Sequence, residues 1–421
     1  MAIDKMPLEA RFDPFSQETL ARPYAFYAAL RAEAPVWQDP ATGIFIVSKA
    51  ADVRAVAMNP RIFSSATRDA MRASSPELQA VEAVYQSKGW ARPGTLGHSD
   101  PPEHTRYRRM VLPWFSPARM RNVKSHIVEV VEELLDDLQA KGSGRVCDFQ
   151  QEFSVPMPIY VFAGQLGVPR EEMHLFERFG DAGIEAIGFD VPLSRRIELA
   201  HIGVEEQHYF AAKVDWFRLH PADILISDLA NARDENGAYF SIPEILSMIN
   251  ILVLGGNETT TNALSLALWL VCREGLQRSL RKRPSSIPAF VEEALRFHSP
   301  VHFINRITTA EIVLGGKQIP ARSRVMISFA SANRDEAIYA DADLFRLDRM
   351  NERPHLAFGA GIKHCIGAPL ARLELNLAFS RLLARTNDVR LATNDFVPTL
   401  TPHPIAPSVQ SLPVIFSFCN P

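Results

Sequence analysis

The sequence predicts a mainly α-helical fold with small β-sheets, and two observations lead to this class. Apolar residues recur at helical spacing in Asn122–Gln139 and in a much longer segment from Ser241 to about Cys272. Strand-like segments bounded by turn residues are few and short, the clearest being a small β-rich region formed by about 36–47 and 312–327. No clean linker divides the 421 residues into halves.

Turn residues mark the boundaries of the remaining elements. Pro23–Glu33 has the pattern of a short amphipathic helix, and Val36–Val47 that of a hairpin with Asp39-Pro40 and Thr42-Gly43 at its turn. Ile312–Ile327 is a strand region interrupted by two glycines and a proline, and Ala368–Arg385 is a helix.

The longest predicted helix has an unusual middle. Ser241 followed by Glu244 is typical of a helix start, and a helix reaching Cys272 would span roughly 45 Å at about 1.5 Å per residue. It is apolar nearly all round, yet Gly255–Asn262 combines two glycines with acidic, amide and hydroxyl side chains. Because local rules are usually broken at functional places, this segment is a candidate site; a kinked core helix is the plainer alternative.

Composition excludes several classes of protein. The formal net charge of -3 and the lack of a basic stripe argue against nucleic-acid binding. Met1–Phe15 lacks the apolar core of a secretory signal, and no run of about 18 apolar residues occurs, so no membrane anchor and a cytoplasmic location are expected. Cys147, Cys272 and Cys419 are expected to be small buried residues, since no CxxC pair is present.

The fourth cysteine, Cys365, lies in the glycine-rich segment Phe358–Gly367. Glycines on both sides of a cysteine allow a tight turn and a close approach to a flat ligand. The predicted helix after this segment would lower the thiol pKa at its N-terminus. The residues alone therefore suggest a buried, activated thiolate that serves as a nucleophile or as a metal ligand.

This segment resembles the haem-binding signature of the cytochromes P450, in which Phe, Gly, a basic residue, Cys and Gly recur at the same spacing. The resemblance extends over nearly the whole chain. It implies one cytochrome P450 domain over residues 1–421, of the soluble bacterial type, with haem b (heme b, iron protoporphyrin IX) as cofactor. Cys365 would be the axial ligand of the haem iron.

Two further segments match the family. Glu293 and Arg296 are three residues apart on a predicted helix, which alone is weak support. The family places such a pair in a buried structural network with a third residue, which corresponds to Arg349 here. The segment from Asp100 resembles the start of the family's helix beside the haem, which implies that His104 and Arg108 bind the haem propionates. Arg306 and Lys363 match further propionate-binding positions, although Lys363 departs from the commoner His or Arg.

The polar middle of the long helix resembles the family's oxygen-activating motif, with Glu258 and Thr259 as its acid and alcohol. The implied activity is a monooxygenase that inserts one oxygen atom from O2 into a C–H bond, with these two residues supplying protons. A hydrophobic substrate is expected because the residues matching the family's substrate pocket are apolar apart from one glycine: Ile184, Ile187, Ile251, Leu252, Gly255, Val301, Phe303, Ile304 and Ile405. Arg68, Arg72 and Arg92 are available to bind a carboxylate.

The resemblance also implies external electron supply, from a ferredoxin and its ferredoxin reductase. A basic face made by Arg106, Arg108 and Arg109, with Arg372 as a further candidate, would attract an acidic donor. Three other functions are possible: a peroxide-driven peroxygenase, a non-catalytic haem sensor or recruitment module, and a hydrolase with a thiolate nucleophile. The Glu258-Thr259 pair argues against the first, and intact Cys365 and Thr259 argue against the second. No pattern of a His partner and oxyanion donors supports the third.

Overall fold

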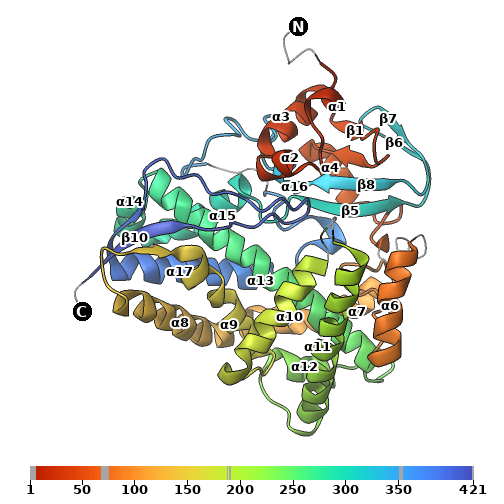
Figure 1. Cartoon of the computed structure of the whole chain (residues 1–421), viewed down its shortest axis with the longest axis horizontal. Coiled ribbons are helices and arrows are strands. Elements are labelled where there is room, and N and C mark those ends of the chain that lie inside the picture. Colours follow the sequence, from red (N-terminus) through yellow and green to blue (C-terminus); the bar gives the residue numbers. More distant parts are fainter. Residues whose placement is uncertain (1–5, 68–74, 187, 189–190, 350–353, 420–421) are drawn as a thin grey trace. The chain divides into compact units, whose positions relative to one another are not determined.

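Helices dominate the structure, a computed structural model, and its sheets are small, which confirms the predicted fold class (Figure 1). The structure describes residues 6–67, 75–186, 188, 191–349 and 354–419. The chain divides into two compact units. The first unit comprises residues 1–64, 127–157 and 258–421, and the second unit comprises residues 65–126 and 158–257.

The first unit contains the sheets. A five-stranded sheet has the order β1-β2-β8-β5-β3, in which β2 and β8 are parallel and the other neighbours are antiparallel. A three-stranded sheet has the order β4-β10-β9, and β6 pairs with β7. The strands are β1 (Val36–Gln38), β2 (Phe45–Val47), β3 (Phe63–Ser64), β4 (Val146–Asp148), β5 (Phe303–Thr308), β6 (Ile312–Leu314), β7 (Lys317–Ile319), β8 (Arg324–Ser328), β9 (Thr386–Leu391) and β10 (Pro413–Phe418).

The predicted hairpin is present as β1 and β2, with Val36 opposite Val47. The carboxylate of Asp39 accepts a hydrogen bond from the N–H of Thr42 at 2.9 Å, which stabilises the turn. The strand β5 was not expected from the sequence, although it pairs with β8 (Figure 1) and with β3. One of its two pairing partners, β3, is distant in sequence, so local pattern alone gave little sign of β5.

The helices that lie wholly in the first unit come from all three of its chain segments. They are α1 (Leu8–Arg11), α2 (Gln17–Ala21), α3 (Tyr24–Glu33), α4 (Ala50–Ala57), η3 (Gln150–Ser154), α14 (Gln277–Lys282), η5 (Pro284–Ser286), α15 (Ile287–Phe297), α16 (Phe329–Ala332), η6 (Gly361–Lys363) and α17 (Ala368–Arg385). The predicted helices at Pro23–Glu33 and Ala368–Arg385 are therefore confirmed as α3 and α17.

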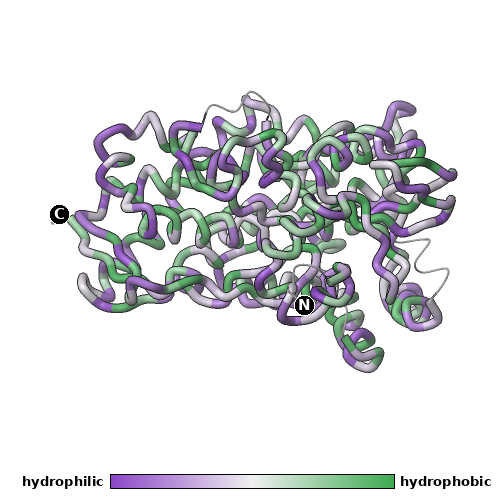
Figure 2. Tube along the Cα trace, turned by 90° about the horizontal axis from the view of Figure 1, so that it is seen from above, coloured by the Kyte–Doolittle hydropathy of each residue, from purple (hydrophilic) through white to green (hydrophobic). Residues whose placement is uncertain are grey.

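The described part of the second unit is helical. Its helices are α6 (Pro76–Lys88), α7 (Glu103–Val111), η2 (Leu112–Phe115), η4 (Arg170–Glu172), α10 (Met173–Ala186), α11 (Leu193–Leu219) and α12 (Leu225–Asn231). Within this unit α11 packs against α6, α10 and α12. Hydrophilic residues interrupt the hydrophobic ones along the chain (Figure 2), and no helix in the described ranges has the length and hydropathy needed to span a membrane.

Three helices have residues in both units: α8 (Pro117–Ala140), α9 (Pro156–Gln165) and α13 (Ile242–Arg273). The last is the predicted long helix, and it continues unbroken through the glycine and threonine residues at its middle. Its start is fixed by Ser241, whose N–H and hydroxyl both donate to a carboxylate oxygen of Glu244, at 2.8 and 2.7 Å. The start predicted from the capping residues is thus confirmed, and the helix ends at Arg273, one residue beyond the predicted Cys272.

Candidate active site

Cys365 lies in a tight loop whose shape depends on glycine. Gly359 and Gly361 have φ angles of 70° and 69°, a left-handed conformation that side chains rarely adopt. The N–H of Cys365 donates to the carbonyl oxygen of Phe358 at 2.8 Å, which closes the loop. The side chain of Cys365 is exposed, whereas the sequence suggested a buried thiolate. The folded loop thus leaves the sulfur accessible to a ligand from outside the chain.

Cys365 lies close to the N-terminus of a helix. α17 begins at Ala368, three residues after Cys365. The first turn of a helix has N–H groups without partners inside the helix, and its positive end stabilises a nearby anion. A cysteine beside a helix N-terminus therefore ionises more easily than a free thiol.

The other three cysteines lie in less suitable places. Burial raises the pKa of Cys147 to about 11 and that of Cys272 to about 12, so both favour the neutral thiol. Cys147 is buried as expected, but Cys272 and Cys419 are only partly buried. They are less covered because Cys272 is close to the end of α13 and Cys419 follows the last strand.

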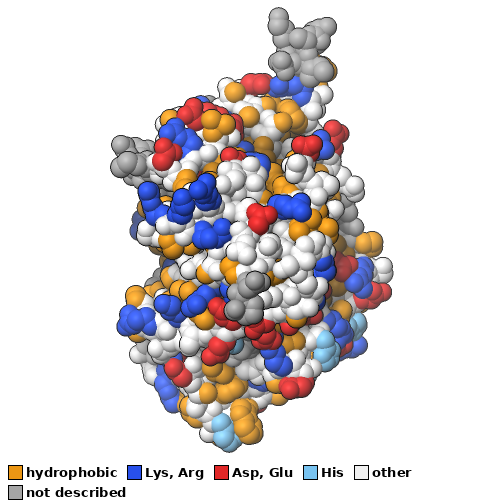
Figure 3. Space-filling view, turned by 90° about the vertical axis from the view of Figure 1, so that its left-hand side faces the viewer, with side chains coloured by type: hydrophobic (Ala, Val, Ile, Leu, Met, Phe, Trp, Pro, Cys, Tyr) orange, Lys and Arg blue, Asp and Glu red, His pale blue; other side chains and the backbone are white. Residues whose placement is uncertain are grey.

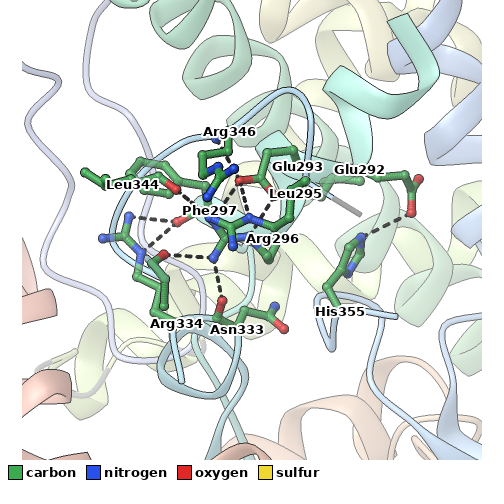
Figure 4. Close-up of polar contacts among 12 residues, drawn as sticks. Glu292, Glu293, Leu295, Arg296, Phe297, Asn333, Arg334, Leu344, Arg346 and His355 are labelled. Carbon is green, nitrogen blue, oxygen red and sulfur yellow. Dashed lines mark hydrogen bonds and ion pairs between the residues drawn. The ribbon is translucent and has the colours of Figure 1, made fainter. Parts of the chain in front are cut away.

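A buried ion-pair network surrounds Glu293 on α15 (Figure 4). Arg296 donates to both carboxylate oxygens of Glu293 at 2.8 Å, and Arg349 donates to one of them at 3.0 Å. The same carboxylate accepts from the N–H of Arg346 at 3.0 Å. The side chain of Arg296 has no exposed surface and that of Glu293 only 3%. The three residues grouped by the sequence analysis are therefore in contact.

The remaining donors of Arg296 bind backbone carbonyls. They reach Asn333 at 2.8 Å and Ala342 at 2.9 Å, as well as Leu344 at 3.2 Å. Neighbouring Arg334 donates to the carbonyl of Phe297 at 2.8 and 3.0 Å. The network thus fixes the end of α15 against the segment between α16 and Arg349.

We expect Glu293→Gln to destabilise the fold by about 3 kcal/mol, because removing one member of a buried ion pair leaves the other charge uncompensated. Glu292→Gln is the matched control. Glu292 is the preceding residue, but its side chain is 38% exposed and that of its partner Arg372 is 36% exposed, so solvent screening should make the loss smaller than at Glu293. Denaturant unfolding of both variants measures the difference, and equal losses would contradict a special role for the buried network.

Glu292 itself belongs to a cluster that the sequence analysis missed. Arg372 of α17 donates to its two carboxylate oxygens at 2.7 and 2.9 Å, and His355 Nε2 lies 3.2 Å from it. Burial alone would raise the pKa of Glu292, but the hydrogen bonds from Arg372 and His355 lower it to about 2. The cluster joins α15 to segments on both sides of the Cys365 loop. The only feature of the sequence that could have indicated this cluster is the pair of adjacent acids, Glu292 and Glu293.

The polar middle of α13 is held by specific contacts inside the first unit. The amide nitrogen of Asn262 donates to Glu258 at 3.3 Å, and its amide oxygen accepts from the N–H of Val409 at 2.8 Å. A backbone N–H can only donate, so the amide of Asn262 must direct its nitrogen toward Glu258. The hydroxyl of Thr261 donates to the carbonyl of Ser154 at 3.0 Å, outside its own helix.

A second acid adjoins this part of α13. Glu374 of α17 is 3% exposed and forms a hydrogen bond with Thr260. Burial raises the pKa of Glu374 to about 8, against the opposing effect of that hydrogen bond. Burial thus favours the neutral form of Glu374. The sequence analysis missed it because a glutamate within a helix is usually a surface residue.

Comparison with known proteins identifies the chain. Residues 218–387 match the family profile described as Cytochrome P450. Cytochrome P450 109 of Bacillus spizizenii is 32% identical over 405 residues, covering 94% of this chain and 92% of that protein. The chain belongs to the cytochrome P450 family.

Solved structures agree with this P450 assignment. Cytochrome P450 CYP109Q5 from Chondromyces apiculatus has a TM-score of 0.83 and 31% identity, covering 97% of this chain and 99% of that one. CYP109E1 from Bacillus megaterium in complex with testosterone has a TM-score of 0.79 and 28% identity, covering 94% and 99%. The family, the helical P450 fold and the monooxygenase class are thereby confirmed, and so is haem b as the family's cofactor.

The Cys365 loop of this P450 fits a haem. Its accessible sulfur at a helix N-terminus suits an iron ligand, and its glycines leave room for a flat group. Two predicted propionate partners, Arg306 on β5 and Lys363 in η6, are in the same unit as the loop. His104 and Arg108 belong to α7 in the second unit, four residues apart and so on one helix face. These assignments stay predictions.

The predicted pocket residues of this P450 are divided between the units. Ile184, Ile251, Leu252 and Gly255 lie in α10 and α13 of the second unit, and Ile187 lies outside the described residues. In the first unit the carbonyl of Ile405 accepts from the N–H of His302 at 2.7 Å, which brings it next to β5. Phe303 and Ile304 face opposite sides of that strand: Phe303 packs on Tyr27, with ring centroids 5.5 Å apart.

Proposed function

We propose that this P450 inserts one oxygen atom from O2 into a C–H bond of a hydrophobic small molecule, and that a separate ferredoxin with its reductase supplies the electrons. The observation that carries the proposal is the Cys365 loop, where an accessible thiol precedes a helix N-terminus within a glycine-shaped turn. A bound haem would supply the oxygen-activating redox chemistry, and a thiolate ligand favours O–O cleavage.

The chain's own residues would hold the haem and deliver protons. Cys365 would ligate the iron, with Arg306, Lys363, His104 and Arg108 binding the propionates. Glu258 would carry protons from solvent to Thr259, whose hydroxyl would donate to the oxygen being reduced. The hydrogen bond from Asn262 to Glu258 supports this assignment, since it fixes the position of the acid.

A hydrophobic substrate is favoured by the apolar character of the predicted pocket residues. CYP109E1, which crystallised with testosterone, is one relative whose ligand is of this kind. The three arginines give little support to a carboxylate anchor: Arg92 donates to Glu82 at 3.1 and 3.3 Å, and Arg68 and Arg72 lie outside the described residues.

The arginines expected to attract an acidic electron donor form ion pairs with glutamates of this chain, which reduces their net positive charge. Arg106 pairs with Glu244, Arg109 with Glu235 at 3.3 Å and Arg372 with Glu292 at 2.7 Å. On the face in Figure 3, acidic side chains likewise lie close to several groups of Lys and Arg. The net positive charge available for steering is therefore smaller than the arginine count suggests, and we expect a moderate dependence on salt.

The test is reconstituted turnover with a panel of hydrophobic compounds. We expect none with NADH or NADPH alone, and product when a ferredoxin and its reductase are added, at rates that fall as salt rises. Arg109→Glu should lower the rate, whereas Arg278→Glu is the matched control, being an exposed cation on α14. Turnover with nicotinamide alone would contradict the proposed donor, and equal effects of both variants would contradict the proposed docking face.

A further inference from the structure

The second unit contains a small polar cavity that the proposed reaction does not use. It lies among α6, the following loop, α11 and α13, and its volume is about 30 Å³. That volume holds one or two groups of the size of water. It is lined by Tyr85, Arg92, Gly203, Glu206, Gln207, Phe210, Leu246, Ser247 and Asn250.

Two buried hydrogen-bonding side chains face this cavity. Glu206 and Ser247 are each 7% exposed. The amide nitrogen of Asn250 donates to Glu206 at 3.3 Å, while the hydroxyl of Ser247 has no hydrogen-bond partner among the described residues. A buried hydroxyl without a partner costs free energy, so its presence in a cavity points to a guest that supplies the missing hydrogen bond.

Two of the residues that line the cavity are held in place by their neighbours. Both polar atoms of the Gln207 amide bind the backbone of Trp90, at 2.9 and 3.0 Å. Gly203 makes room for Tyr85, because a Cβ at that position would lie 2.1 Å from the Tyr85 hydroxyl. The cavity therefore keeps a tyrosine hydroxyl, a carboxyl group and a serine hydroxyl close together.

The charges around the cavity favour a neutral guest. The positive charge of Arg92 acts on Glu206 and would repel an ammonium group, whereas the Glu206 carboxyl would disfavour a carboxylate. Burial raises the pKa of Glu206 to about 7, although Asn250 and Arg92 act in the opposite direction. Near neutral pH this group can thus either donate or accept a hydrogen bond.

We infer that the cavity binds the hydroxyl or carbonyl oxygen of an otherwise apolar substrate. Ser247 and Gly255 are eight residues apart on α13, or about 12 Å along the helix, and the predicted pocket residues Ile251 and Leu252 lie between them. The substrate would therefore carry its oxygen roughly 12 Å from the part that lies at Gly255. This inference rests on the proposed function, since it specifies the class of hydrophobic substrate.

The test compares two probes that differ only at one end: 1-decanol, and undecane, which has a methyl group in place of the hydroxyl. Equilibrium dialysis with the haem-containing full chain measures their binding without requiring turnover. We expect Glu206→Leu to lower the affinity for 1-decanol about 10-fold, which is equivalent to the loss of one or two hydrogen bonds. The affinity for undecane should stay within about 2-fold of that of the unaltered protein. Ser247→Ala should lower the affinity for 1-decanol but not that for undecane. Glu206→Gln should keep most of the 1-decanol binding that Glu206→Leu loses.

Glu205→Leu is the matched control, because Glu205 is an exposed neighbour on α11 that pairs with Arg178 at 2.7 Å. It should change neither affinity. The inference would be overturned if Glu206→Leu lowered the affinity for both probes equally, or did not lower that for 1-decanol. It would also be overturned if 1-decanol did not bind the unaltered protein, and the cavity would then be a water site. Selective binding without any oxidation would instead count against the proposed function.

Discussion

Replacing Cys365 with Ser is expected to remove the red-shifted band that the reduced, carbon monoxide-treated protein shows when a thiolate ligates its iron. Serine preserves the size of the side chain, so the loop closed by the N–H of residue 365 and the carbonyl of Phe358 should still form. The hydroxyl, however, is a far weaker iron ligand than a thiolate. Monooxygenase turnover should be abolished with the band, because the thiolate is what favours O–O cleavage.

Serine replacements of Cys147, Cys272 and Cys419 are the controls. Burial raises the pKa of the first two to about 11 and about 12, so neither is suited to ligate iron as a thiolate. All three variants should keep the band. Its survival in Cys365→Ser, with its loss in one of the other variants, would contradict the assignment of the iron ligand.

The sequence predicted the helices more fully than the strands. Capping at Ser241, the glycines at the Cys365 loop and helical periodicity act over a few residues, and these features appear where they were expected. β5 forms because Phe303–Thr308 pairs with both β8 and β3, and its pairing with β3 spans more than two hundred residues of chain. Such pairing depends on the tertiary fold, so the pattern of the segment itself does not show it.

For the candidate site, motifs located residues but not their partners. The resemblance grouped Glu293, Arg296 and Arg349, which are in contact. It gave no sign of Glu292 with Arg372, or of Glu374 with Thr260, because each pair joins different helices through side chains that are ordinary on a helix surface. Burial raises the pKa of Glu374, whereas hydrogen bonds from Arg372 and His355 lower that of Glu292. Neither environment can be read from a single helix.

Removing the Thr259 hydroxyl is expected to uncouple electron consumption from product formation. The motivating feature is an acid and an alcohol side by side within an otherwise apolar helix, with the acid held by Asn262. Thr259→Ala should bind haem and substrate normally and still consume reduced nicotinamide through the donor chain. The electrons should leave as hydrogen peroxide, since protonation would no longer be directed to O–O cleavage. Glu258→Gln should instead slow turnover by about 10- to 10⁴-fold, the range typical of a lost proton-transfer group.

Thr261→Ala is the matched control for this prediction. Thr261 is the same residue type two positions further along α13. Its hydroxyl donates to the carbonyl of Ser154 at 3.0 Å, so it stabilises the fold and is not expected to deliver protons. This variant should lose stability, by about 1 kcal/mol or somewhat more for a buried hydrogen bond, with its coupling unchanged. The measurement is product formed per nicotinamide consumed, alongside hydrogen peroxide released. If Thr259→Ala behaves like Thr261→Ala, less stable but fully coupled, then Thr259 has no part in proton delivery, and the haem assignment would stand without it.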